Sequence, residues 1–309
     1  MICKVTKCLV LLLVVFGIQQ LKAQVETSPV QIITVDSFVV HAVRDGLNVQ
    51  DFVQMIQEDT TFYRAFQNLR RIEYDGSATV RMFNEDHLSI ASYSNRMSQF
   101  LDGKCRWMQF PFEVNTGDFF DKHKQLNYYT AGVFSYIFLY RDTICGNIVE
   151  TDNNAGSDDK LELRKEQLKT LIFNPGRPVN GIPLIGDKME IFSPEMQQYY
   201  DYTIAREKFA TGVDCFVFTI KKKPEAEKGK DVVINELTTW FDVDSKEIVA
   251  RNYQLSYFTS LFDFDVSMKV RMGTIDGYRV PVSIKYSGYW DIPFRDPEIG
   301  NIDISVWGR

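Results

Sequence analysis

The chain has 309 residues, 45% of them hydrophobic and 14% aromatic, and carries a formal net charge of −6. That much apolar material suffices for one large core or two smaller ones. The acidic balance argues against nucleic acids and anionic membrane surfaces as partners, because both are bound through clustered lysine and arginine.

The N-terminal segment is typical of a secretion signal. Lys4 and Lys7 precede an apolar run over residues 8–18, which is short for a membrane span. We expect cleavage after Ala23 and release into the periplasm or the cell exterior; an uncleaved N-terminal anchor is the alternative. Gln24, and not a cysteine, follows the expected cleavage site, so a lipoprotein is not predicted.

Three cysteines remain after this cleavage: Cys105, Cys145 and Cys215. They are too few for a disulfide scaffold. Two interpretations stay open, one bridge with one buried thiol or three buried thiols, because a free cysteine packs like a small apolar residue.

Two short amphipathic helices are predicted after a strand over residues 30–42. The first has apolar residues at helical spacing over 49–56, behind Asn48 as a capping residue. The second has the same spacing over 62–69. Strands and turns are expected from Arg71 onward.

The middle of the chain is less regular. Residues 125–140 are rich in aromatic side chains and favour a helix over a strand, whereas 150–159 form the best predicted loop. A helix is expected over 160–172, followed by a connector rich in Pro and Gly over 174–186. We therefore expect a single β-rich domain, residues 24–309, with a loop or insert at 105–160.

The C-terminal third shows the clearest strand pattern. Apolar and polar residues alternate strictly over 262–272, and alternate again over 280–286 after the turn at Asp276 and Gly277. The segments 237–243 and 248–257 flank another turn in the same way. Together they predict an antiparallel meander with one apolar face.

Motifs that would support catalysis or metal binding are missing. The three histidines, His41, His87 and His123, are far apart and lack a paired spacing. No serine sits in a G-x-S-x-G turn, and Cys215 lies in an apolar strand where a nucleophile is not expected. We predict no catalytic residue, no metal and no cofactor, which weighs against an enzyme without deciding the question.

The aromatic residues of the meander are the candidates for ligand contact. An incompletely filled interior of the sheet would expose them to an apolar ligand, whereas a filled core between sheet and helices would bury them without any ligand. The candidate lining residues are Trp240, Phe241, Tyr257, Phe262 and Trp290.

Two hairpins resemble the lipoprotein-localisation carriers of the LolA/LolB/LppX type. One is Glu236–Arg251, in which an aromatic residue and an aspartate precede a tight turn and an arginine-bearing return. The other pairs Phe262–Met272 with Val280–Tyr286. Segments such as 171–176 are similar to those of exported bacterial proteins with no assigned activity.

The resemblance implies an α+β fold, in which a strongly curved antiparallel sheet forms a half-barrel with short helices on its concave side. It also implies an exported, non-catalytic protein that binds a lipid or a lipoprotein acyl chain in an apolar groove. An envelope protein is a second candidate partner, and the oligomeric state is not predicted. The alternatives are an outer-membrane β-barrel, against which the predicted helices and Pro281 within a strand argue, and an exported hydrolase without a recognisable motif.

Overall fold

A computed structural model shows the fold of the chain. It describes residues 30–35, 38–43, 47–146, 172–176, 185, 187–259, 263–292 and 295–309. The predicted signal, the loop at 150–159 and nearly all of the predicted helix at 160–172 lie outside the described residues.

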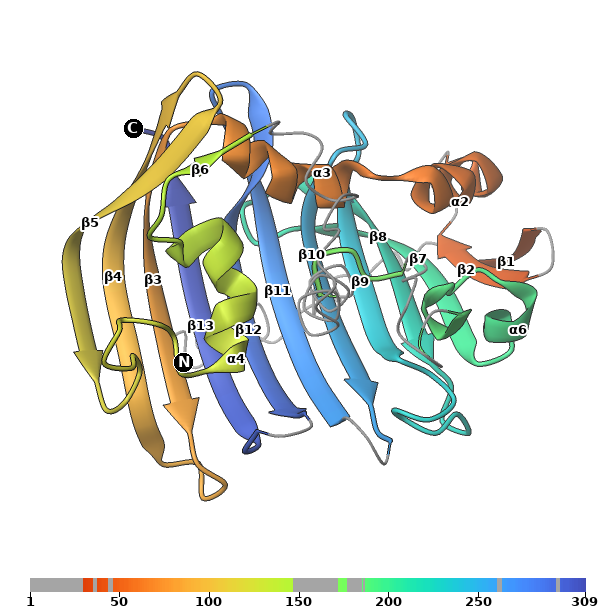
Figure 1. Cartoon of the computed structure of the whole chain (residues 1–309). Helices are drawn as coiled ribbons and strands as arrows, with labels where there is room; N and C mark the ends of the chain where they lie inside the picture. Colours follow the sequence, from red (N-terminus) through yellow and green to blue (C-terminus); the bar gives the residue numbers. More distant parts are fainter. Residues whose placement is uncertain are drawn as a thin grey trace, which may run out of the picture.

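In the described part of the chain, thirteen strands form one sheet in the order β1-β2-β7-β8-β9-β10-β11-β12-β13-β3-β4-β5-β6 (Figure 1). The strands are β1 (Val30–Val35), β2 (Phe38–Val43), β3 (Tyr74–Phe83), β4 (Ser89–Asp102), β5 (Cys105–Thr116), β6 (Ile144–Cys145), β7 (Tyr200–Lys208), β8 (Asp214–Lys222), β9 (Ile234–Asp242), β10 (Ile248–Tyr257), β11 (Asp263–Ile275), β12 (Tyr278–Asp291) and β13 (Glu298–Trp307). All neighbouring strands are antiparallel except β2 and β7. Within the described residues the edge strands β1 and β6 do not pair with each other, so the sheet is open. The predicted antiparallel, mainly β fold is confirmed.

The helices within the ranges that the structure describes are few and short. They are α2 (Val49–Glu58), α3 (Thr61–Asn68), the 3₁₀ turn η1 (Leu69–Arg71), α4 (Tyr129–Phe134), the π-helical turn η2 (Ser135–Leu139), the 3₁₀ turn η3 (Asp187–Met189) and α6 (Pro194–Gln197). Figure 1 shows α2, α3 and α4 on the same face of the sheet. None of the helices in the described ranges is long and apolar enough to cross a membrane.

The β11–β12 hairpin forms where the sequence predicts it. Asp276 and Gly277 have φ angles of 50° and 79°, the positive values that a tight two-residue turn needs. Pro281 pairs with Met272 beside a register shift, which is where a strand tolerates a proline.

The core lies between the sheet and the helices. Alternate residues of β11, such as Phe264 and Met268, are buried, whereas Lys269 and Arg271 on the other face are exposed. The helices complete the core with aromatic contacts: Phe62 of α3 lies 6.2 Å from Tyr253 between ring centroids. The alternation over the C-terminal strands therefore selects the face that the helices cover.

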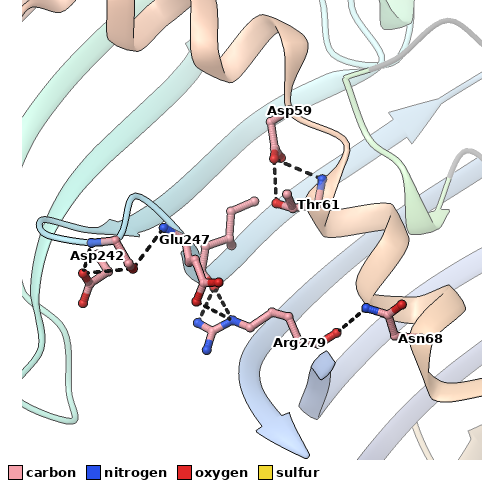
Figure 2. A network of polar contacts seen from close by, with 8 residues as sticks. Asp59, Thr61, Asn68, Asp242, Glu247 and Arg279 are labelled. Atoms are coloured by element: carbon pink, nitrogen blue, oxygen red, sulfur yellow. Dashed lines mark hydrogen bonds and ion pairs between the residues drawn. The ribbon is translucent and has the colours of Figure 1, made fainter. Parts of the chain in front are cut away.

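Helices α2 and α3 confirm the two predicted helices. The Asn48 side chain accepts hydrogen bonds from the backbone N–H groups of Gln50 and Asp51 and caps α2. At the junction, Asp59 accepts from the backbone N–H and the hydroxyl of Thr61, at 3.0 and 2.6 Å (Figure 2). These short-range bonds fix where one helix ends and the next begins.

Polar contacts fasten α3 to the ends of the strands (Figure 2). Asn68 donates to the carbonyl of Arg279 on β12 at 2.9 Å. The Arg279 guanidinium donates to the carbonyl of Ile248 on β10 at 2.6 Å and lies 4.0 Å from the Glu247 carboxylate. Arg279 thus links α3 and its own β11–β12 hairpin to the β9–β10 hairpin.

The segment 105–160, expected as a loop or insert, contains ordered elements of the same sheet. Residues 105–116 form β5, and 129–139 form α4 and η2, which confirms the helix favoured for 125–140. A disulfide joins Cys105 to Cys145, and Cys215 is a buried free thiol. Of the two interpretations left open by the sequence, one bridge with one buried thiol is therefore correct.

Candidate functional site

Trp240 and Phe241 point to opposite faces of the sheet, because successive residues of a strand alternate. The Phe241 ring lies 5.3 Å from that of Phe52 on α2, within the core. Trp240 packs against Phe209 on the other face, with ring centroids 5.7 Å apart. The structure therefore does not bring these two predicted lining residues together.

Tyr257 and Trp290 approach a common neighbour, the buried Phe264. Their ring centroids lie 6.2 and 5.1 Å from it. The Trp290 side chain is only 1% exposed, and its indole N–H donates to the Tyr286 hydroxyl at 2.5 Å. Phe262, the remaining candidate, lies outside the described residues. That these residues line a groove stays a prediction, since the described contacts are those of a packed core.

A cleft of about 430 Å³ lies on the helix-bearing face, at the end of the sheet formed by β3, β4 and β5. Its walls come from β4, from the loop between β5 and α4, from α4 and η2, and from Arg295. The apolar and aromatic lining residues include Tyr93, Phe120, Leu126, Tyr128, Val133 and Leu139. We name this feature the α4 cleft.

The aromatic wall of the α4 cleft is centred on Tyr93. Tyr93 faces the helix side because it alternates along β4 with exposed residues such as Arg96. Its ring stacks on buried Phe119, with centroids 5.2 Å apart, and meets Phe120 edge-on at 5.1 Å. Rings packed in this way give the cleft a rigid apolar side.

Arg141 provides a fixed positive charge at the same wall. Its guanidinium forms an ion pair with Glu113 of β5 and lies over the rings of Phe110 and Phe120, at 5.1 and 5.2 Å. The Tyr93 hydroxyl donates to Glu113 and accepts from Arg141 at 3.3 Å. Burial raises the pKa of Glu113, but the hydrogen bonds from Arg141 and Tyr93 outweigh it, so the pKa lies below its ordinary value.

Glu298 of β13 positions the α4 wall. Tyr128, at the N-cap of α4, makes no capping hydrogen bond with its side chain. The Glu298 carboxylate accepts instead from the backbone N–H groups of Tyr129 and Thr130, at 2.7 and 2.8 Å, and from the Thr130 hydroxyl at 2.9 Å. A negative charge at a helix N-terminus is favourable, so this distant glutamate replaces the missing local cap.

Replacing Glu298 with alanine is expected to lower the free energy of unfolding by about 0.5–2 kcal/mol, the usual cost of losing a helix cap. Urea denaturation followed by circular dichroism measures the change. Glu225→Ala, at an exposed turn residue, is the matched control and should shift stability by less than about 0.5 kcal/mol. Equal effects of the two variants would contradict the capping role.

The α4 wall continues into the π-helical turn η2, and the residues after it, Tyr140 and Arg141, line the cleft. Single π-helical turns are rare and occur often at functional sites. Burial raises the pKa of Tyr140 to about 12, so its hydroxyl stays protonated and donates to Gln99 at 2.7 Å. Among the described residues, no group of three or more His, Cys, Asp and Glu is placed to hold a metal ion.

No family model matches the chain, and no curated protein matches it. Several solved structures are similar to it. The neighbours include a lipoprotein-sorting domain. This domain comes from Vibrio parahaemolyticus and is described as an outer membrane lipoprotein-sorting protein domain. Its sequence is 9% identical to this chain, with a TM-score of 0.26, and the match covers 79% of this chain and 88% of the domain. Another, a DUF1329 family protein from Desulfovibrio piger, is 12% identical, with a TM-score of 0.22 and coverage of 80% and 92%.

The predicted resemblance to lipoprotein-sorting proteins thus recurs among solved structures.

The sequence alone does not predict the α4 cleft. The aromatic run at 125–140 is the available signal, and it favours a helix over a strand without indicating a cleft. Glu113, Arg141 and Glu298 come from three distant segments, and no spacing along the chain relates them.

Proposed function

We propose that this protein is an exported, non-catalytic binding protein that holds the acyl chain of a lipid or lipoprotein in the α4 cleft. The observation that carries the proposal is the cleft itself, which lies on the helix-bearing face of an open sheet and is lined by aromatic and aliphatic side chains beside polar and charged ones. Its volume lies within the range of small-molecule sites, roughly 300–1,000 Å³.

Burial of an acyl chain supplies the affinity in this proposal. Apolar surface removed from water contributes about 25 cal/mol per Å², reduced by the cost of ordering the chain. We infer that the sheet serves as a half-barrel with the helices on its concave side. Trp290 would then support the site from behind, because its ring lies 5.9 Å from that of Tyr129 in the cleft wall.

Export is supported by two independent observations. The N-terminal segment has the composition of a secretion signal, and Cys105 and Cys145 form a disulfide, a bond that persists in oxidising compartments. An envelope protein as a second partner stays part of this proposal.

Native mass spectrometry of the protein purified from its own envelope tests the function, followed by organic extraction of any bound molecule. Delipidated protein is then titrated with a dansylated undecanoic acid. Gly132→Leu should abolish binding, because Gly132 lines the cleft and a Cβ added there meets open space.

Gln50→Leu, which adds the same side chain at an exposed position of α2, should bind the probe like the parent protein. A ligand-free mass together with no binding of the probe would overturn the proposal. So would probe binding by Gly132→Leu at parental affinity.

A further inference from the structure

We infer that the ligand of the α4 cleft is an anionic amphiphile, whose carboxylate or phosphate group binds Arg141 while its acyl chain occupies the apolar part of the cleft. This inference rests on the proposed function and adds the chemical class of the ligand. It assigns Arg141 as the residue that recognises the charged group.

The charge lining the cleft is opposite in sign to that of the chain. The whole chain carries a formal net charge of −6, yet the charged residues lining the cleft are three cations, Lys124, Arg141 and Arg295, and one anion, Asp142. Glu113 pairs with Arg141 without itself lining the cleft. Positive side chains that face a partly apolar cleft attract an anionic group and disfavour a cationic one.

The Arg141 guanidinium is held ready for such a group. Phe110 and Phe120 lie against it, and Glu113 anchors it from one side. Because these contacts fix its orientation in the free protein, little freedom remains to be lost when an anion binds. Its side chain is nevertheless 37% exposed, so a ligand can reach it.

Donor capacity remains on Arg141. A guanidinium carries five N–H donors, and within the described part of the chain the contacts to Glu113 and Tyr93 involve only Nη1 and Nη2. The Nε–H therefore has no partner among the described residues. A carboxylate or phosphate matches the fork of an arginine better than any neutral headgroup does.

The apolar side chains of the cleft lie next to this charge. Phe120 contacts the guanidinium, while Leu126, Val133 and Leu139 line the same cleft. Charge and apolar surface within one cavity fit a molecule that combines both. They fit a free inorganic anion less well, because such an ion would leave the apolar walls uncovered.

Isothermal titration calorimetry on the delipidated full chain tests this inference with four probes: dodecanoate, dodecyl phosphate, dodecanol and inorganic phosphate. The parent protein should bind dodecanoate about tenfold or more tightly than dodecanol, the usual effect of a hydrogen bond to a charged group. Dodecyl phosphate should share this preference, and inorganic phosphate alone should bind far more weakly.

Arg141→Met keeps the apolar stem and removes the charge, so it should erase the difference between dodecanoate and dodecanol. Arg96→Met is the matched control, because Arg96 is exposed on the opposite face of the neighbouring strand β4; it should bind like the parent. Glu113→Gln provides a second test if Arg141→Met does not fold. The Glu113 carboxylate competes with the ligand for Arg141, so its removal should strengthen dodecanoate binding severalfold.

Equal affinities of the parent for dodecanoate and dodecanol would overturn the anionic class while the acyl-binding function stands. Failure of every chain-bearing probe would overturn the proposed function itself. Inorganic phosphate binding as tightly as dodecyl phosphate would show a site for a free anion, and would also overturn the inference.

Discussion

Replacing Trp290 with alanine is expected to lower the free energy of unfolding by about 3–5 kcal/mol, the range found for truncating a large buried aromatic residue. Its ring is 1% exposed and packs 5.1 Å from Phe264 and 5.9 Å from Tyr129. The variant also removes the indole N–H that donates to Tyr286. Urea unfolding monitored by far-ultraviolet circular dichroism, with an unchanged m-value, measures the loss.

Trp240→Ala provides the control for this variant, because Trp240 is only partly buried and packs on the other face against Phe209. A clearly smaller loss is expected. If Trp290→Ala instead left the stability unchanged and removed ligand binding, Trp290 would line a groove as the sequence predicts and would not be part of the core.

Asp59→Ala is also expected to cost about 3–5 kcal/mol, because it breaks a buried ion pair by removing one partner. The Arg251 guanidinium lies 3.7 Å from the Asp59 carboxylate, and each side chain is only 9% exposed. Arg251 is further held by the Thr239 hydroxyl at 2.9 Å and by the Phe62 ring at 4.4 Å. The variant would also remove the cap that Asp59 gives to Thr61.

The double variant Asp59→Ala/Arg251→Met separates the two contributions. Once the buried charge is gone, much of the lost stability should return, since an ion pair replaced by apolar groups is often neutral. A double-mutant cycle on the unfolding free energies gives the coupling. Strictly additive losses would show that the two side chains do not depend on each other.

The elements predicted from the sequence are those fixed by short-range signals. Strict alternation over β11 and β12, together with the Asp276–Gly277 turn, specifies a hairpin without reference to the rest of the chain. In the same way, helical spacing behind Asn48 specifies α2. Strand alternation alone also predicts that Trp240 and Phe241 point to opposite faces. The prediction that both line one groove rests instead on the aromatic content of the meander.

The α4 cleft could not be predicted because it is built by long-range contacts. Glu298 caps α4 across a separation of 169 residues, and Tyr93, Glu113 and Arg141 meet only when β4, β5 and the segment after η2 come together. The C-terminal half of β5 does alternate apolar and polar residues, but the burial is not the one that alternation usually indicates. Phe112 and Val114 are exposed near the edge of the sheet, whereas the polar Glu113 pairs with Arg141 at the cleft wall.

The bridge between Cys105 and Cys145 gives the α4 cleft a dependence on cellular compartment. The two cysteines are 40 residues apart, and the chain between them supplies Glu113, α4, η2 and Arg141. In the reduced chain, ordering this segment costs the conformational entropy of an open loop. The disulfide lowers that cost, because it already restricts the loop in the unfolded chain. A newly made chain in a reducing compartment would therefore hold the walls of the cleft loosely, and the cleft would become fully formed only in an oxidising one.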